Sequence, residues 1–437
     1  MFKITFLGAG STVFAKNVLG DCILTPELGE FEIALYDIDR ERLNDSELML
    51  KNINKKYAGK ATVVSYTDRK AALQGAEFVV NAIQVGGYKP CTVTDFEIPK
   101  KYGLRQTIAD TLGIGGIFRA LRTIPVLEGI AEDMRTCCPR ALFINYTNPM
   151  AILTGYLIRE LKLNTVGLCH SVQVCVEGLY KSLGLEDKIA SAKSKIAGIN
   201  HQAWLLEIED ENGNDMYPEI KRRSLSGEYE KEMSWDLVRH DMMHRFGYYN
   251  TESSEHTAEY NPYFIKSRYP ELIDRYKIPL DEYPRRCEKQ IAEWIKRREE
   301  LVSNQDIEHV RSREFAAPII RAMKSDIPYK INGNVLNTGL ITNLPREACV
   351  EVPCMVDRNG VNPCYIGDLP QQLAALNRTN INVQLLTIEA ARTRKKEAVY
   401  QAAYLDPHTA AELSLDDIRS LCDDLFEAHK DWLPEYH

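Results

Sequence analysis

The stretch Lys3-Ile4-Thr5-Phe6-Leu7-Gly8-Ala9-Gly10-Ser11 decides the fold of this chain. Its first five residues predict a buried strand, the glycines follow at once, and a helical segment comes next. This order is typical of dinucleotide binding, because the glycines let the backbone approach a pyrophosphate at the helix N-terminus. A second predicted strand, residues 32–36, ends at Asp37, an acid suited to the ribose diol of NAD. Val13 stands where the full pattern has a third glycine, so an ordinary strand-to-helix turn is the alternative. The candidate NAD-binding residues are Gly8, Gly10, Ser11 and Asp37.

Short apolar strands alternate with helical segments through the first part of the chain. The further predicted strands are 62–65, 78–82, 141–145 and 165–168. Helical segments between them include 39–57 and 115–135. Such alternation favours a parallel sheet that is covered on both faces by helices. The sequence therefore predicts an α/β fold whose first domain, residues 1–190, is a Rossmann-type parallel sheet that binds NAD.

The alternation breaks down after about residue 190. Residues 195–200 and 204–209 are predicted to be paired strands, with a turn at 210–213, and later segments mix helices with one more strand-rich patch. We expect residues 191–437 to form a mixed α+β domain that binds the substrate, with the active site between the two halves.

Composition excludes several classes of protein. The chain has 437 residues, a hydrophobic fraction of 44% and a net charge of −8, which is typical of a globular chain and argues against nucleic acid or an anionic membrane as partner. No apolar stretch reaches the roughly 18 residues of a spanning helix. Eleven cysteines, an odd number, do not indicate a disulfide framework, so we expect a reducing, cytoplasmic location.

A cysteine and two histidines follow predicted strands. Cys169 and His170 come directly after the strand at 165–168, and His201 ends another apolar segment. Ligands of open α/β sheets bind at the carboxyl ends of the strands, and a thiolate with an imidazole can hold a divalent metal that keeps open positions. The alternative is a buried structural cysteine and a hydrogen-bonded histidine.

Three further segments carry polar groups that suit a sugar ligand. Asn148 closes another strand, and its amide either binds a hydroxyl or forms a turn before proline. The glycine-rich loop 108–116 contains one acid, Asp110, and is either a mobile active-site loop or a tight connection. Residues 251–263 are dense in acids and aromatic rings, which suits sugar hydroxyls and pyranose faces, and the alternative is a polar helix start.

Together these motifs resemble those of the NAD- and manganese-dependent glycosidases of glycoside hydrolase family 4, and within it those of the bacterial α-galactosidases. The similarity covers essentially the whole chain, at residues 4–12, 86–96, 108–116, 145–150, 169–173, 197–201, 251–260, 276–284 and 406–411. The resemblance implies a fold like that of lactate and malate dehydrogenases. It also implies a homodimer or homotetramer, with residues 191–437 contributing to oligomerisation.

The resemblance further implies hydrolysis of α-galactosides such as melibiose through oxidation and elimination, an exception to the usual two-carboxylate scheme. NAD takes hydride from C3 of the sugar, and the ketone so formed acidifies the proton on C2. A base removes that proton and the aglycone leaves from C1, while a divalent metal, Mn²⁺ or another, holds the C2 and C3 oxygens. Water then adds and the hydride returns, so no reduced cofactor accumulates.

Residue roles follow from the matching motifs. Cys169 and His201 match the metal ligands, and Asn148 matches a substrate-binding asparagine. Tyr260 is the expected C2 base, with Tyr263 as second choice. Because a tyrosine ordinarily titrates near 10, the base needs a nearby cation or metal to act at neutral pH.

The acid that helps the aglycone to leave is less well defined by the resemblance. Family members that cleave phosphorylated glucosides carry aspartate directly after the metal cysteine, whereas this chain has His170 there. A histidine near its ordinary pKa can donate a proton, and Asp110 is the alternative acid. The change from aspartate argues against a phosphorylated substrate.

Other activities stay open at this point. The sister activities of the same family are α-galacturonidase, α-glucuronidase and α-glucosidase, and a uronate would need a cation such as Arg285 or Arg286 aimed at its carboxylate. A hydroxy-acid dehydrogenase would share the fold but carry a Gly-x-His-Gly-type catalytic histidine, which we do not find. A non-catalytic NAD sensor would have no use for the thiolate–imidazole pair.

Overall fold

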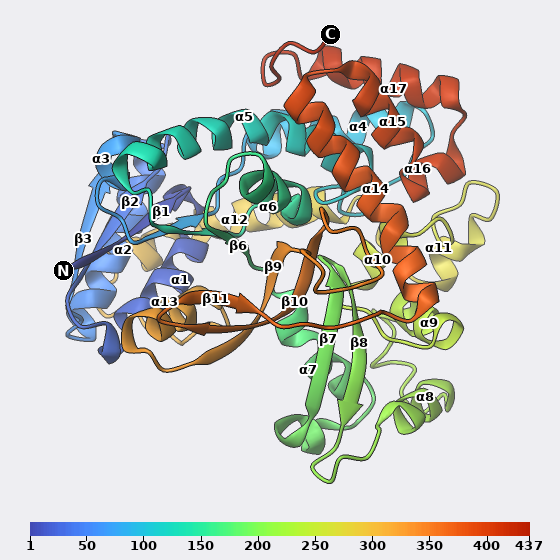
Figure 1. Ribbon diagram of the computed structural model, residues 1–437, viewed down its shortest axis with the longest axis horizontal. Coiled ribbons are helices and arrows are strands. Elements are labelled where there is room, and N and C mark those ends of the chain that lie inside the picture. Colours follow the sequence, from blue (N-terminus) through green and yellow to red (C-terminus); the bar gives the residue numbers. More distant parts are fainter.

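A parallel sheet with strand order β3-β2-β1-β4-β5-β6 forms the N-terminal part of the molecule (Figure 1). The computed structural model describes all residues, 1–437. These strands are β1 (Phe2–Leu7), β2 (Phe31–Tyr36), β3 (Ala61–Tyr66), β4 (Phe78–Asn81), β5 (Leu142–Asn145) and β6 (Thr165–Gly167). Every residue of β1, β4, β5 and β6 is buried, as expected for central parallel strands covered on both faces. The predicted Rossmann-type sheet is thus confirmed.

Helices lie between most of these strands and continue through the rest of the chain. In the first half they are α1 (Val13–Ile23), α2 (Arg40–Lys56), α3 (Arg69–Leu73), α4 (Val93–Lys101), α5 (Gly113–Cys137), α6 (Met150–Arg159) and α7 (Ser171–Ser182). In the second half they are α8 (Tyr217–Leu225), α9 (Leu237–Phe246), α10 (Ser254–Tyr260), α11 (Glu271–Arg275), α12 (Glu282–Ser303), α13 (Ala316–Ser325), α14 (Gln371–Thr393), α15 (Lys396–Tyr404), α16 (Pro407–Glu412) and α17 (Leu415–Ala428). None is long and apolar enough to cross a membrane.

The sheet does not end at β6 but continues in antiparallel pairing through β9, β10, β7 and β8. These strands are β7 (Lys193–Ile199), β8 (Gln202–Glu209), β9 (Tyr329–Leu336), β10 (Cys349–Asp357) and, paired only with β10, β11 (Gly360–Pro363). A row of paired residues, Gly167, Asn334, Glu351 and Gly198, crosses from β6 to β7. The carboxyl end of the parallel sheet is thereby tied to the β7–β8 hairpin.

The turn that joins β7 to β8 is Asn200–His201, because Ile199 pairs with Gln202. The paired strands were expected here, and the predicted turn at 210–213 is present, but it follows β8. The tight turn matters for function, because it places His201 at the tip of a hairpin with a positive φ of 62°.

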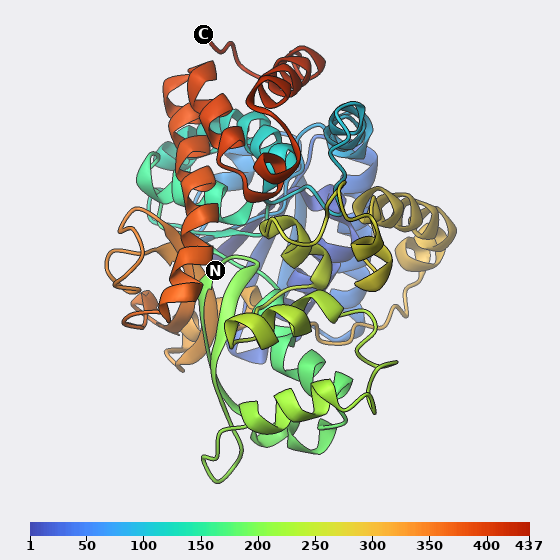
Figure 2. The same cartoon turned by 90° about the vertical axis from the view of Figure 1, so that its right-hand side faces the viewer.

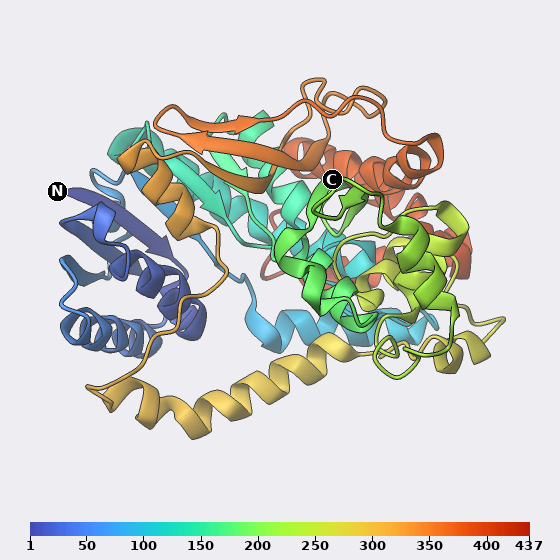
Figure 3. The same ribbon diagram turned by 90° about the horizontal axis from the view of Figure 1, so that it is seen from below.

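One core runs through both halves of the chain. A cluster of 82 buried residues includes the parallel strands together with β9, β10 and residues of α13, α14, α15 and α17, so the second half does not fold away from the first. Figure 3 shows α12 along the outside of the molecule, where Arg298 donates to Asp45 of α2 at 2.7 Å. Figure 2 shows α17 at the end of the molecule opposite the turn at residues 210–213, which follows β8. The division of function at residues 190 and 191 stays a prediction.

Candidate active site

The glycine turn after β1 has the geometry that dinucleotide binding needs. Gly8 has a φ of 87°, and a Cβ there would lie 2.6 Å from the carbonyl oxygen of Ala82, so only glycine fits. The Gly10 amide donates to Asp37 Oδ2 at 2.6 Å, and Ser46 donates to the Ala9 carbonyl at 2.6 Å, which holds the turn. The acid that ends β2 therefore faces the turn at the start of α1, as the sequence predicted.

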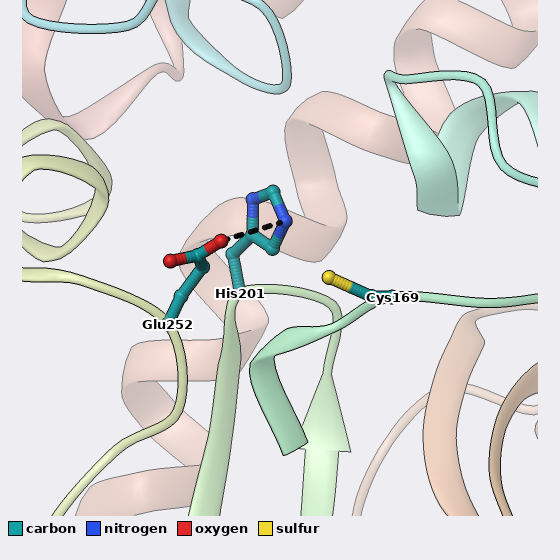
Figure 4. Close-up of side chains that lie close together, drawn as sticks. All are labelled: Cys169, His201 and Glu252. Atoms are coloured by element: carbon teal, nitrogen blue, oxygen red, sulfur yellow. Dashed lines mark ion pairs between the residues drawn. The ribbon is translucent and has the colours of Figure 1, made fainter. Parts of the chain in front are cut away.

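Cys169 and His201 lie together although 32 positions separate them in the sequence. Cys169 comes two residues after β6, and His201 forms the tip of the β7–β8 hairpin. The row of paired residues from β6 to β7 lines up these two strand ends. Figure 4 shows both side chains pointing toward each other and toward Glu252, and the ligand atoms of all three lie within 4.8 Å of one another.

The protonation states of this pair suit a metal ligand set. Burial, together with the nearby His256, lowers the pKa of His201 to about 4, so its imidazole is neutral, which is the form that binds metal. Burial and the nearby Glu252 raise the pKa of the Cys169 thiol, so a cation is needed to hold it as the thiolate.

Helix α10 anchors the glycine-rich loop that contains Asp110. The carboxylate of Glu259 accepts from the backbone amides of Thr107, Ile108 and Ala109, at 2.5, 3.0 and 3.2 Å. The loop is therefore held against α10, unlike the mobile active-site loop that was one of the two expectations, and Asp110 on it lies within the candidate site. The 251–263 segment is not a solvated helix start, because His256, Glu259 and Tyr260 are all buried.

Asp110 lies between Asn148 and His256. Its Oδ2 accepts from Asn148 Nδ2 at 3.2 Å, and His256 Nε2 is 3.8 Å from its Oδ1. Although burial favours the neutral acid, the neighbouring His256 and Arg119 hold the pKa of Asp110 well below its ordinary range. An ionised carboxylate has no proton to give, so this structure argues against Asp110 as the acid and for a role in holding Asn148.

Tyr260 is the tyrosine beside the metal pair. Its ring centroid is 6.2 Å from that of His201, and its hydroxyl is buried without a hydrogen-bond partner. Burial and the surrounding acids raise its pKa well above 10 in the absence of metal, as the expected need for a cation implied. Tyr263 is 47% exposed and packs against Phe246, so it does not share this position.

His170 faces a carboxylate that the sequence did not bring to attention. Its Nε2 contacts Glu314, and its ring lies 6.3 Å from that of Phe14 at the start of α1 and 6.4 Å from that of Tyr146. The hydrogen bond with Glu314 raises the pKa of His170 to about 9. The imidazole is therefore a cation at neutral pH and has a proton to donate.

Sequence reasoning missed several acids that surround the pair. Glu351 is a fully buried carboxyl on β10 that accepts from Asn334 at 3.2 Å, and burial raises its pKa well above the ordinary range. The available signal was an acid inside an apolar strand pattern, Cys349-Val350-Glu351-Val352. Glu252 lay in a segment that we singled out, but no spacing rule joined it to Cys169.

The residues of this site fit both expected cofactors, the divalent metal and NAD. Buried polar atoms without a hydrogen-bond partner gather around the pair, at Asn200, His201 Nδ1, Thr251 Oγ1, His256 Nε2, Tyr260 OH and Glu351 Oε2. Such atoms are costly unless a ligand or water satisfies them. Thiolate, imidazole and carboxylate together suit a divalent transition metal, and the glycine turn with Asp37 suits NAD.

Matches to known proteins define the class to which this fold and site belong. Residues 3–185 match the model of the Family 4 glycosyl hydrolases, and residues 196–409 match that of the Family 4 glycosyl hydrolase C-terminal domain. The chain belongs to family 4 of the glycosyl hydrolases and is an enzyme of that class. It is 64% identical over 436 residues to the α-galactosidase of Bacillus subtilis, and the match covers 100% of each chain.

Solved structures agree with the fold. The Bacillus subtilis protein lplD has a TM-score of 0.85 at 27% identity, and the match covers 97% of this chain and 99% of that one. A 6-phospho-α-glucosidase from gut microorganisms, in complex with NAD and Mn²⁺, has a TM-score of 0.80 at 21% identity with full coverage of both chains. Cryptosporidium parvum malate dehydrogenase has a TM-score of 0.54 at 13% identity, covering 90% and 99% of the two chains, which confirms the dehydrogenase-like fold alone.

Proposed function

We propose that this enzyme is an NAD- and divalent-metal-dependent α-galactosidase, with Mn²⁺ as the metal that it uses. The observation that carries the proposal is the placement of Cys169 and His201 beside Tyr260, at the edge of the sheet that also holds the glycine turn. The choice of galactose is supported by the full-length similarity to the Bacillus subtilis α-galactosidase.

Each site residue has one role in the proposed reaction. When bound, NAD would supply hydride transfer at C3 and the metal would supply polarisation of the C2 and C3 oxygens. Cys169 and His201 hold the metal, and Asn148, fixed by Asp110, binds a substrate hydroxyl. Tyr260 takes the proton from C2.

Two residues serve the leaving group and the cofactor. His170 donates a proton to the aglycone oxygen, because Glu314 keeps its imidazole charged at neutral pH. Asp37 binds the adenosine ribose, and Gly8, Gly10 and Ser11 border the pyrophosphate.

A uronidase activity finds less support in the site. Arg286 pairs with Glu255 and Glu282, both at 2.9 Å, and Arg285 pairs with Glu282 at 2.8 Å. Neither arginine is therefore free to receive a C6 carboxylate. We keep α-galacturonidase, α-glucuronidase and α-glucosidase as alternatives that the substrate assay below separates.

Location and assembly are part of the proposal. All eleven cysteines are free thiols, which supports a reducing cytoplasm. Ile291 and Ile295 are 47% and 71% exposed on α12, which supports a homodimer or homotetramer. We propose that residues 1–190 bind NAD and that residues 191–437 bind the sugar and contribute to assembly.

One assay tests the activity. Nitrophenyl α-galactoside, α-glucoside, the matching uronides and the 6-phosphates are offered with and without NAD, Mn²⁺ and a thiol reductant. We expect cleavage of the α-galactoside only when NAD and metal are both present, with no accumulation of NADH. Full activity after both have been removed would contradict the mechanism, and steady production of NADH would indicate a dehydrogenase.

A further inference from the structure

We propose that Glu252 is a third protein ligand of the divalent metal, beside Cys169 and His201. The inference rests on the proposed function, in which those two residues hold the metal. It goes further by making the metal site a thiolate–imidazole–carboxylate set, which would leave coordination positions open for a substrate.

The distances allow a shared metal. Ligand atoms that each bind a metal at about 2.0–2.3 Å lie about 3–4.5 Å from one another. The Glu252 carboxylate, His201 and Cys169 present ligand atoms within 4.8 Å of one another, and Glu252 Oε1 is 3.8 Å from His201 Nε2 (Figure 4). These separations are close to those between ligand atoms that share one cation.

No protein group satisfies the Glu252 carboxylate. It accepts no hydrogen bond, and the ring nitrogens nearest to it, His201 Nε2 and His256 Nδ1, are both 3.8 Å away, beyond hydrogen-bond range. Its side chain is only 25% exposed. A largely buried charge needs a partner, and a divalent cation at this place supplies one.

The backbone fixes Glu252 on both sides. Asn250 pairs with Trp204 of β8, and the amide of Thr251 donates to the Ala203 carbonyl at 2.8 Å, so the segment is held to the hairpin that carries His201. Glu252 itself has a φ of 72°, and α10 begins two residues later. A non-glycine residue in this conformation carries a cost of about 1–2 kcal/mol, which the surrounding pairing must offset.

The charge balance of the three ligands suits a catalytic site. A thiolate and a carboxylate with a neutral imidazole offset the two positive charges of the cation. Three protein ligands leave open positions for sugar oxygens, as catalytic metal sites require. A carboxylate also makes the set harder than Cys–His alone, which favours Mn²⁺ relative to thiophilic metals.

Binding of Mn²⁺ alone tests the inference without any turnover. Free Mn²⁺ is measured by electron paramagnetic resonance in titrations of the full-length protein with NAD present. We expect Glu252→Gln to raise the Kd by about tenfold or more and Glu252→Asp to restore part of the loss. Glu255→Gln is the matched control, because it removes one carboxylate charge three residues further along the chain, where the carboxylate is paired with Arg286. It should change the Kd by less than about twofold, because its carboxylate is not part of the proposed ligand set.

Cobalt absorption gives a second readout. Co²⁺ bound to Cys169 shows a thiolate charge-transfer band, which should persist in Glu252→Gln while the visible d–d bands change shape. Melting curves of the metal-free variants show whether each is folded. Unchanged Mn²⁺ affinity and unchanged d–d bands in Glu252→Gln would overturn the inference, and so would an equal loss in Glu255→Gln.

The two proposals fail in distinguishable ways. If Cys169→Ser and His201→Ala lose Mn²⁺ while Glu252→Gln binds it normally, Glu252 is not a ligand and the proposed function stands. If Cys169→Ser and His201→Ala both bind Mn²⁺ as the wild type does, the metal site of the proposed function is wrong as well.

Discussion

At the scale of single residues, the site works by setting protonation states through near neighbours. His201 is neutral because it is buried beside His256, whereas His170 is charged because it contacts Glu314. Two histidines of one site thus differ in pKa by about 5, from about 4 to about 9. In the proposed mechanism, the neutral His201 binds the metal and the charged His170 donates a proton.

The pairing of His170 with Glu314 makes a pH prediction. Nuclear magnetic resonance titration of the metal-free protein should give His170 a pKa of about 9, and Glu314→Gln should return it toward the ordinary 6.5. Because folding raises this pKa, the pairing stabilises fully below pH 6.5, and the stabilisation is lost as pH rises through about 9. The wild type should therefore exceed Glu314→Gln in unfolding free energy most below pH 6.5, and this difference should shrink as the pH rises through about 9.

Glu177→Gln is a control for the His170 titration, because it removes a carboxylate that does not contact His170. Glu177 pairs with Arg313 and Lys181 on the exposed side of α7. Glu177→Gln should leave the His170 titration unchanged. An ordinary His170 pKa in the wild type would contradict the contact and remove the reason to choose His170 as the acid.

At the scale of elements, α10 connects the metal pair to the loop of Asp110. Glu259 accepts hydrogen bonds from three backbone amides of the loop, and the next residue, Tyr260, lies beside His201. The short helix therefore aligns the expected base, the loop that supports Asn148 and the metal ligands.

Removing this clamp should loosen the loop. Glu259→Gln replaces one acceptor oxygen by an amide donor that faces other donors, so we expect a loss of about 1–3 kcal/mol in unfolding free energy. Hydrogen exchange at the amides of Thr107, Ile108 and Ala109 should become faster, while Glu255→Gln leaves it unchanged. Unaltered exchange at those amides in Glu259→Gln would show that the loop is held by other contacts.

Local patterns predicted most of the parallel sheet. The expected strands at 62–65, 78–82, 141–145 and 165–168 agree within about a residue with β3, β4, β5 and β6, because apolar runs between turn residues are local signals. The insertion of β9 and β10 between β6 and β7 was not predicted. Pairing of Asn334 with Gly167 depends on contacts far apart in sequence, which no short window contains.

The candidate site was likewise predictable only where local sequence signals marked its residues. Cys169 and His201 were found because strand ends and the family motifs pointed to them. Glu314 and Glu351 were missed, because each reaches the site from a segment more than a hundred residues away in the sequence. Their roles follow from burial and contact, which the sequence alone does not supply.

At the scale of the whole molecule, residues from both halves meet at one candidate active site on one sheet. The glycine turn and Cys169 belong to the first half, and His201, Glu252 and Tyr260 belong to the second. The continuous sheet and the shared core hold these parts in a fixed relation, as a reaction that combines hydride transfer with proton abstraction needs.

The central claim is that C2 of the sugar is deprotonated during turnover, and solvent deuterium tests it most directly. Galactose released in heavy water should carry deuterium at C2, and Tyr260→Phe should lower turnover by about two to four orders of magnitude with NAD binding little changed. Deuterium incorporation with a fully active Tyr260→Phe would keep the mechanism but place the base elsewhere. Galactose that keeps protium at C2 would contradict the elimination mechanism, even if NAD proves essential.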